Sequence, residues 1–124
     1  MAEEHPDYAD LEWVGNAKHE LLAFPADIIR SFGHALDRAQ RGVTPHLQVR
    51  PMQSIGRGVF ELKDADERSW YRVVYLAVID NVIYVLHCFE KRSRKTDRRD
   101  IDIARSRLAI AKRRIQERRD NAGD

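Results

Sequence analysis

The chain has 124 residues, of which 43% are hydrophobic and 34% are charged, and its formal net charge is +2. This length indicates one domain, and the apolar content excludes a disordered or low-complexity protein, because such chains lack the apolar surface that offsets ordering entropy. The single cysteine, Cys88, excludes an intramolecular disulfide framework and a cysteine-based zinc finger, and it fits a reducing cytoplasm.

Residues 1–10 are polar and acidic, and we expect them to form a flexible leader before a single domain over residues 11–119. No apolar signal-peptide core follows them, so secretion is not expected. The apolar stretch 73–89 is interrupted by two polar residues and is too short to cross a membrane. Residues 11–14 have the character of a short strand.

Two helices are expected next. Residues 17–24 predict a short helix that Pro25 stops, and residues 26–41 predict a second helix that Gly42 ends. Spacings of three and four place the apolar residues of the second helix on one face. These are Ile28, Ile29, Phe32, Ala35, Leu36 and Ala39. The pair forms an αα-hairpin whose apolar face needs a partner surface.

Strands dominate the middle of the chain. Residues 59–63 alternate like a short strand, and residues 70–79 and 82–91 are rich in β-branched and aromatic side chains. Asp80-Asn81 between the last two tolerates left-handed backbone angles, as a two-residue hairpin turn requires. The sequence therefore predicts a β-hairpin over residues 70–91.

A third helix is predicted from residue 97 onward, with a flexible tail over residues 120–124. Helices and strands in this order predict a small α+β domain with antiparallel strands. We expect the helices to cover one face of the sheet and to leave the other face free for a site at one end.

Charge is distributed unevenly along the chain. Residues 1–89 hold nine Lys/Arg and thirteen Asp/Glu, whereas residues 90–119 hold thirteen Lys/Arg and five Asp/Glu. A local positive block of this kind attracts polyanions more strongly than the net charge indicates. The alternative interpretation is a solvated helix face.

The predicted turn sets the register of the hairpin. Val74 then faces His87, Arg72 faces Phe89, and Trp70 faces Lys91. Directly opposed residues share a face of the sheet, so these six side chains lie together at the open end of the hairpin. The opposite face then carries Tyr71, Val73, Tyr75, Leu86, Cys88 and Glu90.

The six side chains form a patch suited to RNA. Arginine and lysine bind phosphates, exposed aromatic rings such as Trp70 and Phe89 stack on bases, and a histidine moves protons near neutral pH. Basic residues that follow the hairpin extend the patch: Arg92, Arg94, Lys95, Arg98 and Arg99. Taken singly, an arginine such as Arg72 is more often a surface salt-bridge partner and a histidine such as His87 is more often structural, and Trp70 and Phe89 fit the core better than a base-stacking role; only their co-location favours a site.

Other classes of site find little support. Gly56-Arg57-Gly58 is too short for a phosphate-binding glycine loop, and the five histidines lack metal-ligand spacing. Cys88 has no evident activating partner. We therefore expect no metal ion and no cofactor.

Several motifs occur in a characteristic order. The most specific are Tyr71-Arg-Val-Val-Tyr75 and His87-Cys-Phe-Glu-Lys-Arg-Ser93. Together with four other motifs along the chain, they resemble the phage-derived HigB-like toxins of the RelE/ParE superfamily of type II toxin–antitoxin systems. The resemblance covers most of the chain and includes Leu11-Glu-Trp-Val-Gly15, Leu21-Leu-Ala-Phe-Pro25, Phe32-Gly-His-Ala-Leu36 and Gly58-Val-Phe-Glu-Leu62.

The resemblance implies a small RelE/ParE-like fold, with an N-terminal αα-hairpin packed on a twisted antiparallel sheet and a C-terminal helix. It implies a cytoplasmic toxin that cleaves mRNA on the ribosome and is neutralised by an antitoxin, often a helix-turn-helix protein. Arg72 matches the strand arginine that contacts the scissile phosphate. Lys91 and Arg92 match the basic pair at the end of the next strand, one residue of which supports catalysis in those relatives.

The sequence also departs from RelE-type nucleases. Those carry lysines on the strand before the Tyr-Arg strand, where this chain has Val59-Phe-Glu-Leu62, and a tyrosine after the basic pair, which is missing here. The acid and base assignments therefore do not carry over, and His87 is the candidate for that role. Two alternatives remain: a gyrase-poisoning ParE-like toxin without nuclease activity, and a non-enzymatic basic module that binds nucleic acid.

Overall fold

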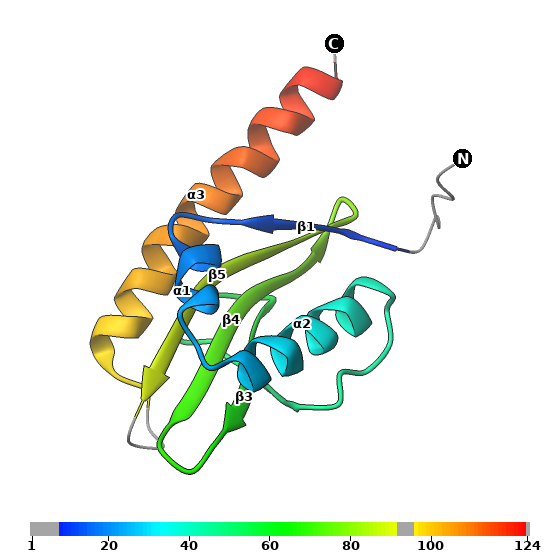
Figure 1. The fold of residues 1–124 in the computed structure, drawn as a ribbon. Coiled ribbons are helices and arrows are strands. Elements are labelled where there is room, and N and C mark those ends of the chain that lie inside the picture. The colour runs from blue at the N-terminus through cyan, green and yellow to red at the C-terminus, as the bar shows by residue number, and fades with distance from the viewer. Residues whose placement is uncertain (1–7, 92–95, 124) are drawn as a thin grey trace.

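The computed structural model describes residues 8–91 and 96–123. Within these residues the strands form one five-stranded sheet in the order β1-β5-β4-β3-β2. The elements, shown in Figure 1, are β1 (Asp10–Trp13), α1 (Ala17–Leu22), α2 (Ala26–Gln40), β2 (Gln48–Pro51), β3 (Val59–Ala65), β4 (Trp70–Ile79), β5 (Val82–Lys91) and α3 (Arg98–Ala122). The α+β class is confirmed, with one departure: β1 pairs parallel to β5, while the other neighbours pair antiparallel.

The β4–β5 hairpin has the predicted turn. Asp80 and Asn81 have φ angles of 51° and 66°, the left-handed conformation that a tight two-residue turn requires. At the open end the pairs are Trp70↔Lys91, Arg72↔Phe89 and Val74↔His87. The register predicted for this end is therefore confirmed.

A β-bulge interrupts the hairpin between its two ends. Tyr75 pairs with Val85, so Leu86 is the extra residue between this pair and Val74↔His87. A bulge breaks the alternation of faces. Leu86 accordingly packs in the same core cluster as Val74, and not on the Tyr71 face where the uninterrupted register places it. The prediction for Leu86 was wrong for this reason.

Helices cover both faces of the sheet, so the prediction that one face stays free was wrong. On one face, α1 and α2 bury Leu21, Phe32 and Leu36 against strand residues such as Tyr71 and Val73. On the other face, α3 buries a stripe of side chains against Val74, Leu76 and Leu86. The stripe consists of Ala104, Leu108, Ala111 and Ile115. Because β4 and β5 are apolar at nearly every position, both of their faces need cover.

The N-terminal strand joins the fold earlier than predicted. The N–H of Ala9 donates to the carbonyl of Gln40 at 2.8 Å, and Ala9 is buried. The hydroxyl of Tyr8 donates to Asp37 at 2.9 Å. These contacts place residues 8–10 in the domain, while the rest of the predicted leader, residues 1–7, lies outside the described residues.

Helix α3 continues past residue 120, where a flexible tail was predicted. The side chain of Gln116 donates to Asp120 at 2.9 Å, and Arg119 pairs with Asp80 in the hairpin turn at 2.6 Å. Both contacts hold the last turns in helical form. None of the helices in the described ranges combines the length and the apolar character needed to cross a bilayer.

Packing of α3 on the sheet is testable by truncation. We expect Leu108→Ala to lower the free energy of unfolding by about 2–5 kcal/mol, because the buried leucine leaves a cavity between α3 and the sheet. Ile110→Ala is the control, since this side chain is 37% exposed on the same helix. Urea denaturation measures both. Equal effects of the two substitutions would contradict this packing.

Candidate functional site

The hairpin register brings Arg72, His87, Phe89 and Lys91 to one face, as predicted, but α3 covers that face. The exposed fractions are 0% for Arg72, 4% for His87, 7% for Phe89 and 6% for Lys91. A buried charge requires a partner, because desolvation without one is expensive. The structure accordingly surrounds each of the three charged or titratable groups with oxygen atoms of other elements.

Arg72 lies in a cluster formed with β3 and the residues before α3. Its Nη1 donates to Glu61 Oε1 at 3.3 Å and to Thr96 Oγ1 at 2.9 Å. The Thr96 hydroxyl in turn donates to Glu61 Oε2 at 3.1 Å. Glu61 is also buried, and its carboxylate is 3.5 Å from Arg50 Nη2 on β2. One carboxylate therefore serves two guanidinium groups.

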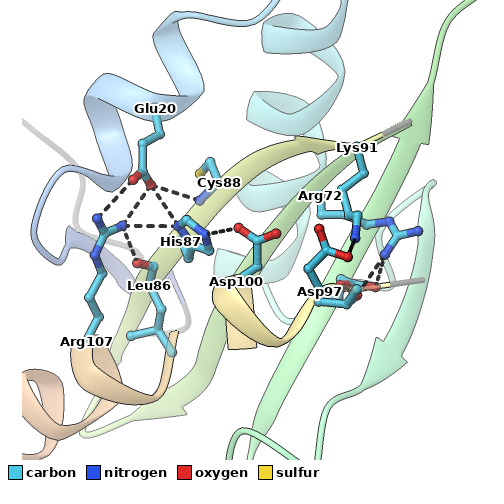
Figure 2. A network of polar contacts seen from close by, with 11 residues as sticks. Glu20, Arg72, Leu86, His87, Cys88, Lys91, Asp97, Asp100 and Arg107 are labelled. Carbon is cyan, nitrogen blue, oxygen red and sulfur yellow. Dashed lines mark hydrogen bonds and ion pairs between the residues drawn. The ribbon is translucent and has the colours of Figure 1, made fainter. Parts of the chain in front are cut away.

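Lys91 lies beside Arg72, as Figure 2 shows. Its Nζ is 2.8 Å from Asp97 Oδ1, and the Asp97 side chain is 69% exposed. Asp97 directly precedes α3, so its carboxylate also interacts favourably with the positive N-terminal end of the helix dipole. The Lys91–Asp97 pair thus ties the end of β5 to the start of α3 at the protein surface.

His87 is enclosed by a separate network, also drawn in Figure 2. Its Nδ1 lies 3.2 Å from Glu20 Oε1 on α1, and its Nε2 lies 2.9 Å from Asp100 Oδ1 on α3. The ring stacks on Phe89 with centroids 4.8 Å apart. Both ring nitrogens are therefore occupied by carboxylates, which favours the structural interpretation of His87.

Glu20 and Arg107 close the outer edge of β5. β1 pairs with β5 only as far as Val85. Beyond that point, the N–H of Cys88 donates to Glu20 Oε1 at 3.1 Å, and Arg107 Nη1 donates to the carbonyl of Leu86 at 3.0 Å. The two side chains pair with each other at 2.7 Å and 2.9 Å. They thus satisfy edge groups that a neighbouring strand would otherwise bind.

The remaining predicted site residues lie at the margin of this face. Trp70 is partly buried, with Lys63 Nζ 5.4 Å from its ring centroid. Phe89 packs in the core, so it offers no open ring for base stacking. Arg98 and Arg99 are exposed on the first turn of α3. Arg92, Arg94 and Lys95 lie outside the described residues.

Sequence reasoning missed Arg50, Glu61 and Glu20, and it used neither Asp100 nor Arg107 as a partner. Glu61 carried a signal, since it is a carboxylate between the apolar residues Phe60 and Leu62. Glu20 and Arg107 are 87 residues apart along the chain. No local pattern marks such a pair.

The thiol of Cys88 is buried in the core. Burial raises the pKa of the Cys88 thiol far above its ordinary value, so the thiol stays protonated at neutral pH and does not act as a nucleophile. Among residues 8–91 and 96–123, no group of three or more His, Cys, Asp or Glu side chains is placed to hold a metal ion.

The Glu20 network predicts acid sensitivity. Burial alone would raise the pKa of Glu20, but hydrogen bonds from His87, Arg107 and the Cys88 N–H lower it from 4.5 to about 2. A lowered pKa in the folded state stabilises the fold above pH 4.5, and this contribution of about 3 kcal/mol is lost as the pH falls toward 2. We expect Glu20→Gln to be less stable at pH 7 and to lose less stability over that interval.

The control is Glu117→Gln, which removes an exposed carboxylate of α3. Urea denaturation at pH 7 and at steps down to pH 2 measures all three proteins. A Glu20→Gln profile parallel to that of the wild type would show that Glu20 is not held ionised by this network.

Comparisons with known proteins place the chain in a family. A chain of the toxin–antitoxin complex RelBE2 from Mycobacterium tuberculosis is similar in structure, with 15% identity and a TM-score of 0.49 over 73% of this chain and 100% of that one. No curated protein sequence matches. The family model described as Phage derived protein Gp49-like (DUF891) matches residues 19–109, well over half of the chain, and the chain therefore belongs to this family.

Proposed function

We propose that this chain is the toxin of a type II toxin–antitoxin system and that it is an mRNA interferase: an endoribonuclease that cleaves mRNA in the cytoplasm, on the ribosome. Membership of the Gp49-like family supports the proposal, as do the motifs shared with HigB-like toxins. The RelBE2 complex provides a parallel for an antitoxin partner. We expect that partner to be a helix-turn-helix protein.

One observation carries the nuclease proposal: Arg72 and Lys91 lie next to each other where the β4–β5 hairpin meets the start of α3 (Figure 2). The exposed Arg98 and Arg99 belong to the same end of the molecule. Two adjacent cations stabilise the negative charge that develops on a phosphate during transfer. Arg92 next to Lys91 would add a third.

The reaction needs no further reactant. The 2′-oxygen attacks phosphorus, the bond from phosphorus to the 5′-oxygen breaks, and the products are a 2′,3′-cyclic phosphate and a 5′-hydroxyl. A base takes the proton of the 2′-hydroxyl, and an acid gives one to the 5′-oxygen. Arg72 and Lys91 would hold the phosphate. Since both nitrogens of His87 are bound to carboxylates, its contacts support a positioning role over that of acid or base.

A second candidate function has its own support. Arg72 is fully buried and paired with Glu61, and His87 and Lys91 are nearly as enclosed. Ion pairs under a helix fit a structural role, as in a ParE-like toxin that poisons gyrase through protein contact. Exposed cations along α3 keep the non-enzymatic nucleic-acid module as a third possibility. Cleavage of mRNA discriminates the first from the other two.

The test is induction of the chain alone in a bacterial host, with primer extension on a translated reporter mRNA. We expect new 5′ ends, and we expect Arg72→Lys to reduce them by at least about tenfold. Lysine keeps the charge beside Glu61 but lacks the planar guanidinium that binds phosphate through two bonds. Arg72→Ala is unsuitable, because it leaves the buried Glu61 carboxylate with only the half-exposed Arg50 and Thr96 as partners, and removing one partner of a buried ion pair costs about 3–5 kcal/mol of stability.

Arg41→Lys is the matched control, since it makes the same change at an exposed arginine of the α2 C-terminus that pairs with Asp37. A thermal melt shows whether each variant stays folded. Full cleavage by folded Arg72→Lys would remove Arg72 from the reaction. Growth arrest without new ends, accompanied by a DNA damage response, would instead establish the gyrase-type function.

A further inference from the structure

A surface cavity of about 450 Å³, wide open to solvent, lies between the β2–β3 connection and the start of α3. Its lining includes Arg50, Gln53, Ser54, Thr96 and Ile101. One wall is held in place, because Arg105 Nε of α3 donates to the carbonyl of Ser54 at 2.8 Å and the neighbouring Met52 and Ile55 are buried.

Thr96 connects the lining of this cavity to Arg72, the candidate catalytic arginine. Thr96 lines the cavity, and its hydroxyl accepts from Arg72 Nη1 at 2.9 Å and donates to Glu61 Oε2 at 3.1 Å. One side chain therefore separates the cavity from the buried Arg72–Glu61 pair. Arg72 itself is fully buried and does not line the cavity, so Thr96 is the residue through which the cavity adjoins it.

Arg50 stands at the mouth of the cavity. Its side chain is 50% exposed, whereas that of Glu61 is 1% exposed. Its contacts with the protein are long: Nη2 lies 3.5 Å from Glu61 Oε1 and 3.5 Å from Met52 Sδ. A guanidinium has five N–H donors, and the exposed half of this one faces solvent beside a carboxylate already paired with Arg72. This arrangement suits an incoming anion.

We propose that this cavity is the entrance through which single-stranded RNA reaches Arg72, and that Arg50 binds a phosphate of the strand at its mouth. The inference rests on the proposed function and adds to it a substrate-binding residue and a path. RNA backbone phosphates match the guanidinium of Arg50 in charge and in planar geometry. An unpaired strand is flexible enough to enter a cavity of this size, which an RNA duplex is not.

The test measures binding by the purified full chain, independently of cleavage. The probe is a short fluorescein-labelled single-stranded RNA with 2′-O-methyl groups, which cannot be cut because the attacking hydroxyl is blocked. Fluorescence anisotropy over about 50–200 mM salt gives the Kd and its salt dependence. We expect Arg50→Ala to raise the Kd about tenfold and to lower the slope of log Kd against log salt by about 0.7, the value for one phosphate of a single strand.

Two further variants sharpen the result. Arg30→Ala removes an equally charged residue from α2, on the other face of the sheet, and we expect it to change the Kd less than about twofold. Ser54→Leu adds apolar volume to the cavity without changing the charge or adding an aromatic ring, and we expect it to weaken binding as well. Should Arg50→Ala fail to fold in a thermal melt, Ser54→Leu decides the question.

The outcomes separate this inference from the proposed nuclease. Arg50→Ala binding that matches Arg30→Ala in both Kd and slope overturns the inference, as does a wild type that does not bind the RNA. If the wild type binds through Arg50 but yields no new 5′ ends in cells, the inference stands and the nuclease proposal fails. If it cleaves and Arg50→Ala cleaves and binds equally well, the nuclease stands and the entrance is wrong.

Discussion

Two cations on the central strands, Arg72 and Lys91, lie beneath a helix, and each has a carboxylate beside it. Glu61 on β3 serves Arg72, and Asp97 at the start of α3 serves Lys91. Removing either carboxylate would leave a buried charge with less compensation, which a small domain tolerates poorly. The position of the first turn of α3 is therefore coupled to the charges of the hairpin as well as to its apolar stripe.

The same constraint links three separate parts of the chain at His87. Glu20 approaches from α1 and Asp100 from α3, and Arg107 neutralises Glu20 while it binds the backbone of β5. The network is partly buried beside the apolar cluster of α3, with His87 at its centre, and polar groups in such a place strengthen one another if all are satisfied. Charged residues thus complete the packing on the very face where an RNA patch was predicted.

Much of the fold could be predicted because its signals are local. The Asp80-Asn81 turn sets the register of the open end, and the spacing of Ala104, Leu108, Ala111 and Ile115 marks α3 as amphipathic. The bulge at Leu86 leaves no such signal. An amphipathic stripe also does not say which face of a sheet it covers, and here both faces are apolar. Because the sequence left this choice of face open, it predicted an exposed patch on the face that α3 covers in the structure.

The candidate site was predictable in part for a related reason. Alternation along β4 and β5 correctly placed Arg72, His87 and Lys91 together. Their partners are set by tertiary contacts between segments that are distant in sequence. Counting charges along the chain does not distinguish a buried, paired arginine from a solvated one. Arg50 shows the limit most clearly, since nothing in the β2 sequence distinguishes it from an ordinary edge-strand arginine before Glu61 and the cavity are seen.

The place of α3 in the chain has a consequence for biosynthesis. All five strands precede α3, so the sheet leaves the ribosome with one apolar face bare and with Arg72 and Lys91 still lacking Thr96 and Asp97. Exposed apolar surface of this kind makes a nascent chain prone to aggregation and a target for chaperones. Native closure of the core cluster under α3 is thus a late event, which takes place after the helix has been synthesised.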